Sequence, residues 1–169
     1  MIKDYNLFIK NARQITSRNF DLFAFSNGLE IRILPLDDAI SHSGFLPFNL
    51  RATFIDGLIG GDSFMSGFEI YFNRFEPDLH DDSVGKLASG SEYEVMIAID
   101  GTDSFQELLG LVYSAFLCKY CNGIMYDPQS DKSYTTLDEI EKLIAFEKNR
   151  LALLAKNEKL NVHNFEGWK

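Results

Sequence analysis

The sequence predicts an α+β fold: an antiparallel or mixed sheet of about five to six strands, helices packed on one face, and a long C-terminal helix. Short segments of alternating apolar and polar residues, separated by glycine, asparagine and proline, predict the strands. Two Ser/Thr-x-x-Glu capping boxes, each followed by apolar residues, predict helix starts. The length of 169 residues suits one core. We therefore expect residues 1–169 to form a single domain, with 156–169 as a mobile tail or a docking arm.

The N-terminal half is predicted to contain a helix followed by hairpin-connected strands. Apolar residues at helical spacing over 6–15 indicate an amphipathic helix. Residues 20–26 and 29–34 flank Asn27-Gly28, a pair typical of a type I′ turn, which indicates an antiparallel hairpin. Residues 48–55 and 68–75 alternate as strands do, and the glycine-rich run 58–67 between them is expected to be an irregular loop.

The C-terminal half is predicted to alternate strand and helix. Residues 93–99 have the clearest strand alternation, and the capping box formed by Ser104 and Glu107 indicates an apolar helix that ends at Asn122-Gly123. A short strand over 123–126 and a turn at Asp127-Pro128 follow. The second capping box, formed by Thr136 and Glu139, indicates the start of the long C-terminal helix.

Composition and charge exclude several classes of function. With 46% hydrophobic and 24% charged residues the chain is globular rather than disordered. Its net charge of −9 repels phosphate backbones and anionic membrane surfaces, so we expect no nucleic-acid partner and no membrane partner. The N-terminus carries no secretion signal pattern, and two cysteines are too few for a disulfide scaffold, so we expect a cytoplasmic protein.

The negative charge is concentrated in one part of the chain. Residues 76–107 hold nine acidic residues and one basic residue, Lys86, which gives 1 − 9 = −8 of the total charge of −9. If these side chains share a face, that face would attract a basic partner. The candidate partner-binding carboxylates within this run are Asp78, Asp81, Asp82, Glu92 and Glu94. Ordinary solvation of turn residues, and complementation of a helix dipole near Glu107, explain the same residues without a partner.

Catalytic and cofactor signals are weak. Asp78, His80, Asp81 and Asp82 offer ligand types for a divalent metal or groups for acid–base chemistry, but the calcium-loop pattern is absent and adjacent surface aspartates are commonly just solvated. Cys118 and Cys121 have C-x-x-C spacing. They are expected at a helix C-terminus, where carbonyl groups oppose a thiolate, and we interpret them as small core residues. We expect no cofactor and no metal.

One apolar pair is a candidate for partner contact. Phe64 and Met65 fall in the glycine-rich run, which lacks the lysine and the spacing of a phosphate-binding loop. Because a loop exposes its side chains, this pair is the apolar element that we expect to touch a partner.

Two segments resemble a known family. Residues 92–101, EYEVMIAIDG, precede the apolar helix, and residues 122–129, NGIMYDPQ, follow it. This strand, helix and G-hydrophobic-hydrophobic-Y-D-P-Q arrangement, within about residues 68–145, resembles small bacterial immunity proteins of contact-dependent and other polymorphic toxin systems. The resemblance implies a non-catalytic α+β protein of the cytoplasm that binds and blocks a cognate, often basic, toxin domain. It transfers no functional residue.

Two alternative functions remain open. An acidic secretion chaperone shares the size, charge and element pattern, and would form a dimer that holds an unfolded client segment. A carboxylate- or metal-dependent enzyme would need the Asp78–Asp82 cluster folded against a pocket, and would lose activity on His80→Ala.

Overall fold

The seven strands in the described part of the chain lie in one antiparallel sheet, in the spatial order β2-β3-β4-β5-β1-β6-β7. The computed structural model describes residues 2–33, 41–55 and 63–162. The strands are β1 (Lys3–Ile9), β2 (Glu30–Ile33), β3 (Ser43–Arg51), β4 (Ser63–Arg74), β5 (Tyr93–Ile99), β6 (Ile124–Asp127) and β7 (Lys132–Tyr134). The helices are α1 (Ser17–Ser26), α2 (Asp82–Leu87), α3 (Gln106–Tyr120) and α4 (Leu137–Lys156), with short 3-10 turns η1 (Ala12–Gln14) and η2 (Pro77–Leu79). The α+β class and the long C-terminal helix are confirmed.

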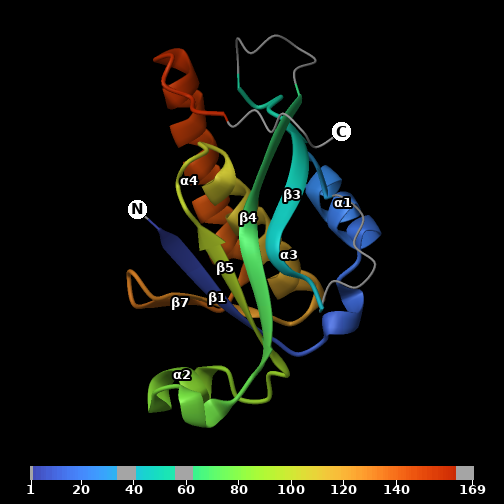
Figure 1. Ribbon diagram of the computed structural model, residues 1–169, viewed down its shortest axis with the longest axis vertical. Helices are drawn as coiled ribbons and strands as arrows, with labels where there is room; N and C mark the ends of the chain where they lie inside the picture. Colours follow the sequence, from blue (N-terminus) through green and yellow to red (C-terminus); the bar gives the residue numbers. More distant parts are fainter. Residues whose placement is uncertain (1, 34–40, 56–62, 163–169) are drawn as a thin grey trace.

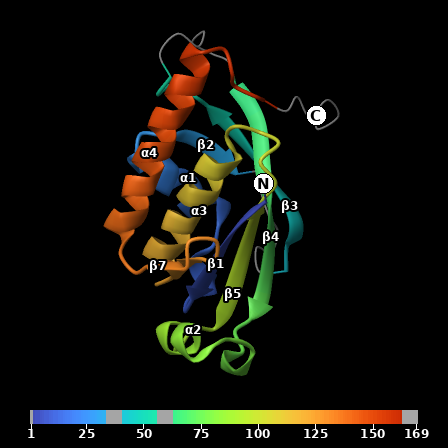
Figure 2. The same ribbon diagram turned by 90° about the vertical axis from the view of Figure 1, so that its left-hand side faces the viewer.

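Three helices cover one side of the sheet. Figure 2 shows α1, α3 and α4 to one side of the strands, with α3 between the sheet and α4. Helix α3 contacts β1, β4, β5 and β6 as well as α1 and α4, and almost all of its side chains are buried. We call this side of the sheet the helix side and the opposite side, which faces the viewer in Figure 1, the open side. The short helix α2 lies at one end of the open side, where Val84 and Ala88 pack against Phe8 of β1.

The core between the sheet and the helices is rich in aromatic rings. Tyr113 of α3 is 1% exposed and lies within 6.1 Å, centroid to centroid, of four phenylalanine rings. These rings are Phe20, Phe48, Phe68 and Phe116, from α1, β3, β4 and α3. Such tilted and edge-on contacts stabilise the core beyond simple burial of apolar area.

Two N-terminal predictions are wrong, the helix over 6–15 and the strand over 20–26, whereas the strands predicted over 29–34, 48–55 and 68–75 correspond to β2, β3 and β4. Residues 6–9 of the segment 6–15, which was expected to be a helix, belong to β1, the fifth strand in spatial order, with Phe8 buried on the open side and Leu7 and Ile9 buried on the helix side. Residues 12–14 of that segment form η1. The expected hairpin is a helix–turn–strand unit: α1 begins after Thr16, whose hydroxyl accepts a hydrogen bond from the Asn19 amide. Gly28, at φ +69°, ends α1 rather than closing a hairpin.

Other expectations need smaller corrections. Strand β4 begins at Ser63, inside the expected glycine-rich loop, and the rest of that loop, 58–62, lies outside the described residues. The Ser104 capping box does not form: the Asp103 carboxylate accepts from the Phe105 amide, and Glu107 binds Lys3 and Tyr5. The sheet has seven strands rather than five to six, since β1 and the short β7 were not expected.

The later elements confirm their predictions. Strand β5 spans Tyr93–Ile99 as expected, with Val95, Ile97 and Ile99 buried. Helix α4 begins after Thr136, and the Glu139 carboxylate accepts from the Thr136 amide at 3.2 Å, as a capping box requires.

The described part of the C-terminal segment is docked. The Asn161 amide donates to Ser104 Oγ, and the Ser104 amide donates to the Asn161 carbonyl, each at 2.8 Å. Leu160 and Val162 pack against the core. Residues 157–162 thus pack against the body of the domain, whereas residues 163–169 of the segment expected to be a mobile tail or a docking arm lie outside the described part. Within the described residues no helix is both long and apolar enough to cross a membrane.

Candidate functional site

The segment between β4 and β5 carries four of the five predicted carboxylates, Asp78, Asp81, Asp82 and Glu92, and forms a compact cap on the open side. Pro77 starts η2, and Asp81 caps α2 by accepting hydrogen bonds from the amides of Ser83 (3.0 Å) and Val84 (2.9 Å). These bonds, with one from the Ser83 hydroxyl, lower the pKa of Asp81, because they stabilise its ionised form. The capping role explains why a helix starts at Asp82.

His80 attaches this segment to the sheet. Its Nε2 lies 3.0 Å from Oε2 of Glu94 on β5, and both side chains are under one-fifth exposed. The imidazole stacks on Phe75 and meets the edge of Phe8, with ring centroids 5.5 and 5.6 Å away. His80 and Glu94 are therefore positioned by packing and by each other.

The nine carboxylates of residues 76–107 do not form one face. Asp78, Asp81, Asp82 and Glu94, which we call the acidic end, gather around His80 and α2. Asp100, Asp103 and Glu107 lie beyond the opposite end of β5, which is about 20 Å long. Glu92 pairs with Arg74 at 3.0 Å, so its charge is compensated.

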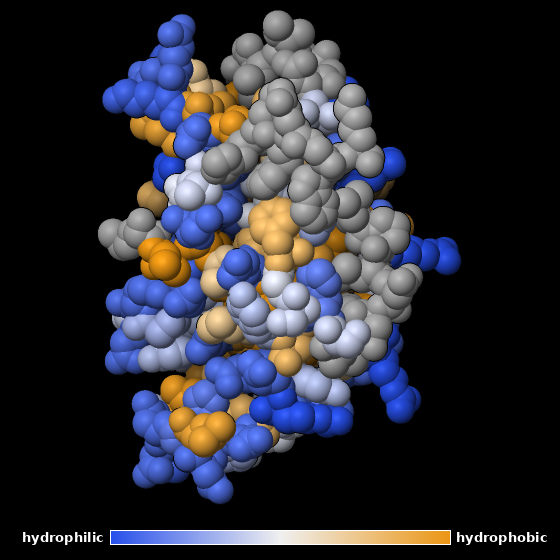
Figure 3. Space-filling view, viewed as in Figure 1, coloured by the Kyte–Doolittle hydropathy of each residue, from blue (hydrophilic) through white to orange (hydrophobic). Residues whose placement is uncertain are grey.

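The acidic end is polar with one apolar spot. Figure 3 shows mostly hydrophilic atoms over α2 and a small strongly hydrophobic patch among them. The exposed apolar residue of the segment is Leu79, which is 76% exposed. Asp78 and Asp82 are exposed and make no ion pair among the described residues. The acidic end therefore presents exposed carboxylates around one exposed leucine.

The same segment lines a shallow depression of about 380 Å³. Its lining residues are Pro77, Asp78, His80, Asp81, Asp82, Gly85, Lys86 and Ser89. No three His, Cys, Asp or Glu side chains in the described part of the chain are close enough to hold one metal ion. In this depression Asp81 is engaged as a helix cap and His80 is bound to Glu94, while Asp78 and Asp82 are exposed.

The predicted apolar pair divides between the two sides of the sheet. Phe64 lies on the helix side, half-buried, and stacks on Phe105 with a centroid distance of 5.6 Å. Met65 lies on the open side of β4, where its sulfur accepts a 3.6 Å hydrogen bond from Asn49 Nδ2. The expectation of a loop that exposes both residues is wrong because they belong to a strand, whose successive side chains point to opposite faces.

The two cysteines are largely withdrawn from solvent, with Cys121 buried and Cys118 half-buried. Burial raises the pKa of Cys118 and of Cys121 to about 12, so neither forms a thiolate at neutral pH. Both are free, and the interpretation as core residues agrees with this environment.

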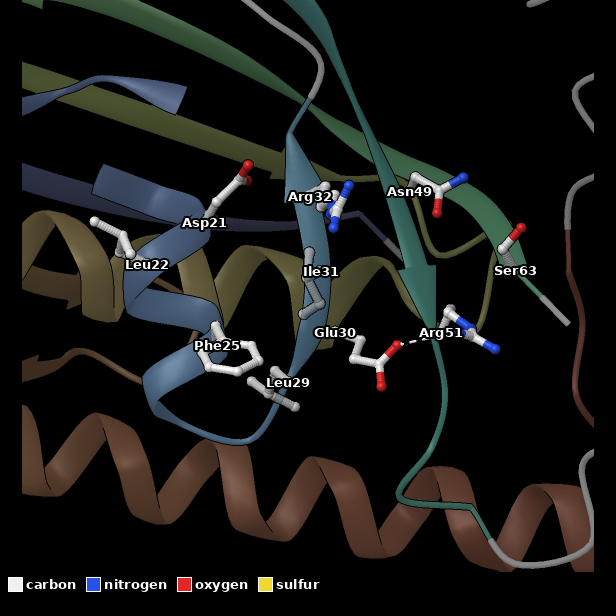
Figure 4. Close-up of a pocket in the computed structure, with 10 residues that line it drawn as sticks. All are labelled: Asp21, Leu22, Phe25, Leu29, Glu30, Ile31, Arg32, Asn49, Arg51 and Ser63. Carbon is white, nitrogen blue, oxygen red and sulfur yellow. Dashed lines mark hydrogen bonds and ion pairs between the residues drawn. The ribbon is translucent and has the colours of Figure 1, made fainter. Parts of the chain in front are cut away.

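A larger hollow lies elsewhere on the molecule, between α1 and the edge of the sheet. It has a volume of about 720 Å³, and Figure 4 shows its lining residues on α1, β2, β3 and the start of β4, with Glu30 of β2 next to Arg51 of β3. Arg51 pairs with Glu30 at 3.3 Å. Asp21 accepts from the Ile33 amide, although burial raises the pKa of its carboxyl. None of the predicted site residues lies here, and the hollow holds no histidine or cysteine.

Sequence reasoning missed the open side of the sheet between α2 and the far strand ends. Glu69 and Tyr71 of β4 lie on this side together with Met96 of β5 and Tyr126 of β6. The alternation in β5 indicates which residues point outward, but the register that brings four strands together is not written in any single segment.

Comparison with known proteins gives no match to a protein-family model, to a curated protein or to a solved structure.

Proposed function

We propose that this chain is a non-catalytic binding protein that neutralises a basic toxin domain, as small bacterial immunity proteins do. The observation that carries the proposal is the acidic end, where Asp78 and Asp82 are exposed and unpaired among the described residues beside the exposed Leu79. A basic partner would relieve the repulsion between these carboxylates and bury the leucine. The segment 92–101 and the motif 122–129, which carry the family resemblance, form β5 and β6 with its turn, and β5 holds Glu94 of the acidic end.

The charge distribution supports a protein partner over a small substrate. The depression beside α2 is shallow, whereas small-molecule sites are enclosed and mostly apolar. Uncompensated surface charge accelerates association with an oppositely charged protein without needing a deep pocket.

The test starts with affinity capture from the native host and continues with a toxicity assay. The tagged chain is used to capture its partner from lysate at low salt, and the captured protein is then expressed alone and together with this chain. We expect a basic protein that stops growth when expressed alone and is tolerated with the wild-type chain. A captured protein with no effect on growth would contradict the immunity function.

Charge-reversal variants locate the interaction. Asp78→Lys with Asp82→Lys should abolish the rescue, because the double variant reverses the charge of the acidic end. The fold should be unaffected, because both side chains are exposed and neither one caps a helix or binds His80. Glu141→Lys with Glu158→Lys, exposed in or after α4 on the other side of the sheet, makes the same change in net charge and should leave rescue intact. Equal loss of rescue in both variants would show that net charge, not the acidic end, is responsible.

A further inference from the structure

Among the described residues, α2 is the helix that covers the open side of the sheet, and it covers one end, where Tyr126 packs against the cluster of Phe8, Val84 and Ala88. Figures 1 and 2 show that α1, α3 and α4 all lie behind the sheet. The register brings Tyr126, Asn6, Met96 and Tyr71 into one row across β6, β1, β5 and β4. The next row contains Asp4, Ala98 and Glu69. We call these seven residues the open face; Glu69 is exposed and the other six are half-buried.

The open face carries negative charge without compensation. Its two carboxylates, Asp4 and Glu69, flank Ala98 on either side, and neither makes an ion pair with any residue that the structure describes. No lysine or arginine stands at the seven positions. Glu94, one row further along β5, continues this charge toward the acidic end. A partner that covers the open face must therefore supply positive charge.

Two tyrosines near the ends of the row are each bound to a carboxylate. Tyr71 donates its hydroxyl to Oε2 of Glu69 at 2.8 Å, and Tyr126 donates to Oδ1 of Asp131 at 2.9 Å. Each pair places an aromatic ring beside an anionic oxygen. A guanidinium or ammonium group bound at such a pair is stabilised by an ion pair with the carboxylate and by a cation–π contact with the ring.

The distance between the pairs follows from the sheet. Tyr71 and Tyr126 are separated by three strand spacings, which is about 14 Å. Met96 and Asn6 lie between them and offer an apolar contact and an amide. The row thus has a tyrosine–carboxylate pair near each end, which we call a cation receptor, and a thioether and an amide between the two receptors.

We propose that the open face docks a folded basic protein that presents two arginine or lysine side chains about 14 Å apart. One side chain binds at Tyr71 and Glu69, and the other binds at Tyr126 and Asp131. This inference deepens the proposed function, on which it rests for the nature of the partner, and extends the contact from the acidic end across the sheet.

Peptide titration tests the two receptors without a known partner. The probe is acetyl-Arg-Gly-Ser-Gly-Arg-amide, whose two arginines are about 14 Å apart when extended, added to the full chain while tyrosine ring resonances are followed by NMR. We expect saturable shifts of the Tyr71 and Tyr126 rings and binding at least tenfold tighter than that of a peptide with one arginine. The citrulline peptide, which is neutral and nearly isosteric, should not shift them. Absence of tyrosine shifts with the arginine peptide would overturn the proposal.

Conservative variants keep the test independent of folding. Glu69→Gln with Asp131→Asn removes both charges while keeping both rings, and asparagine tolerates the positive φ of 51° at position 131. We expect at least a tenfold loss of peptide affinity. Glu141→Gln with Glu158→Gln, with the same change in net charge, should change the affinity less than twofold. Similar losses in both variants would contradict specific receptors.

Measurements of rescue and of affinity with the captured partner distinguish this inference from the proposed function. If rescue from toxicity holds but Glu69→Gln with Asp131→Asn leaves partner affinity unchanged, the open-face inference is wrong and the immunity function stands. If that variant weakens a partner that is not toxic, the open face is a docking surface and the immunity function is wrong.

Discussion

His80 and Glu94, 14 positions apart in the chain, are joined by a 3.0 Å hydrogen bond that fastens the acidic segment to the sheet. The imidazole also packs against Phe8 and Phe75. The bond and the ring contacts hold Asp78, Asp81 and Asp82 next to β5, so their charges add to that of Glu94. The histidine thus serves to position a charged surface.

Substitution of His80 distinguishes this positioning role from catalysis. His80→Ala removes a ring between two phenylalanines and should destabilise the fold by about 1–2 kcal/mol in chemical denaturation. His80→Phe keeps the ring contacts, should cost less, and should leave partner affinity within twofold of wild type. An enzymatic activity lost in both variants while the fold is intact would contradict the positioning role.

Two glycines should respond to alanine with opposite signs. At Gly67 an added Cβ would lie 2.3 Å from the backbone oxygen of Leu46 and 2.6 Å from the Phe45 ring, so Gly67→Ala should destabilise the protein by about 1–3 kcal/mol. At Gly85, in α2, the nearest atom is 3.7 Å away, and Gly85→Ala should stabilise by about 0.5–1 kcal/mol. Urea denaturation of both variants measures the difference. A neutral Gly67→Ala would contradict the close packing of β3 on β4.

The cysteines should be inert in the folded protein. Because burial raises the pKa of Cys118 and Cys121 to about 12, the reactive thiolate is scarce at pH 8. Ellman's reagent should modify neither thiol over an hour in the native state and both within minutes in guanidinium chloride. Rapid reaction of the native protein at pH 8 would revive a redox role for the C-x-x-C pair.

The cap of α2 should weaken in acid. The pKa of Asp81 is lower in the folded protein than in the unfolded chain, so its stabilising effect is complete above the unfolded value of about 4 and is lost as the pH falls through the lower folded value. Amide exchange at Ser83 and Val84, corrected for the intrinsic pH dependence of exchange, should accelerate over this range. In Asp81→Asn, which keeps a capping oxygen without a charge, the corrected rates should depend much less on pH. The same acceleration in both proteins would exclude Asp81 as the cause.

Sequence patterns predicted those elements whose signals are local. Strand β5 alternates cleanly because only its helix-side residues are fully buried, and α4 begins at a capping box whose members are three residues apart. The sequence of β1 lacks the alternation of a half-exposed strand because Leu7, Phe8 and Ile9 are all buried, so its apolar spacing also fits a helix. After α1, Gly28 of the Asn27-Gly28 pair adopts a left-handed conformation that suits a helix end as well as a hairpin turn. The local sequence does not decide between these two structures.

The sequence predicts the part of the candidate site whose residues are close together in the chain. Asp78, Asp81 and Asp82 lie together because they are neighbours in the chain, and Glu94 joins them through His80. The open face could not be predicted, since Tyr126 and Tyr71 enter one row only through the pairing of β6, β1, β5 and β4. Strand register depends on packing across the whole sheet.

The most direct test of the proposed binding function is the association rate of this chain with its captured partner, measured over a range of salt concentrations. We predict that the association rate falls at least tenfold between about 20 mM and 500 mM salt, because the Debye length shrinks from about 20 Å to about 4 Å. Asp78→Lys with Asp82→Lys should associate slowly at all salt concentrations, and Glu141→Lys with Glu158→Lys should follow the wild type. An association rate that neither salt nor the Asp78 and Asp82 reversals change would contradict binding through the acidic end.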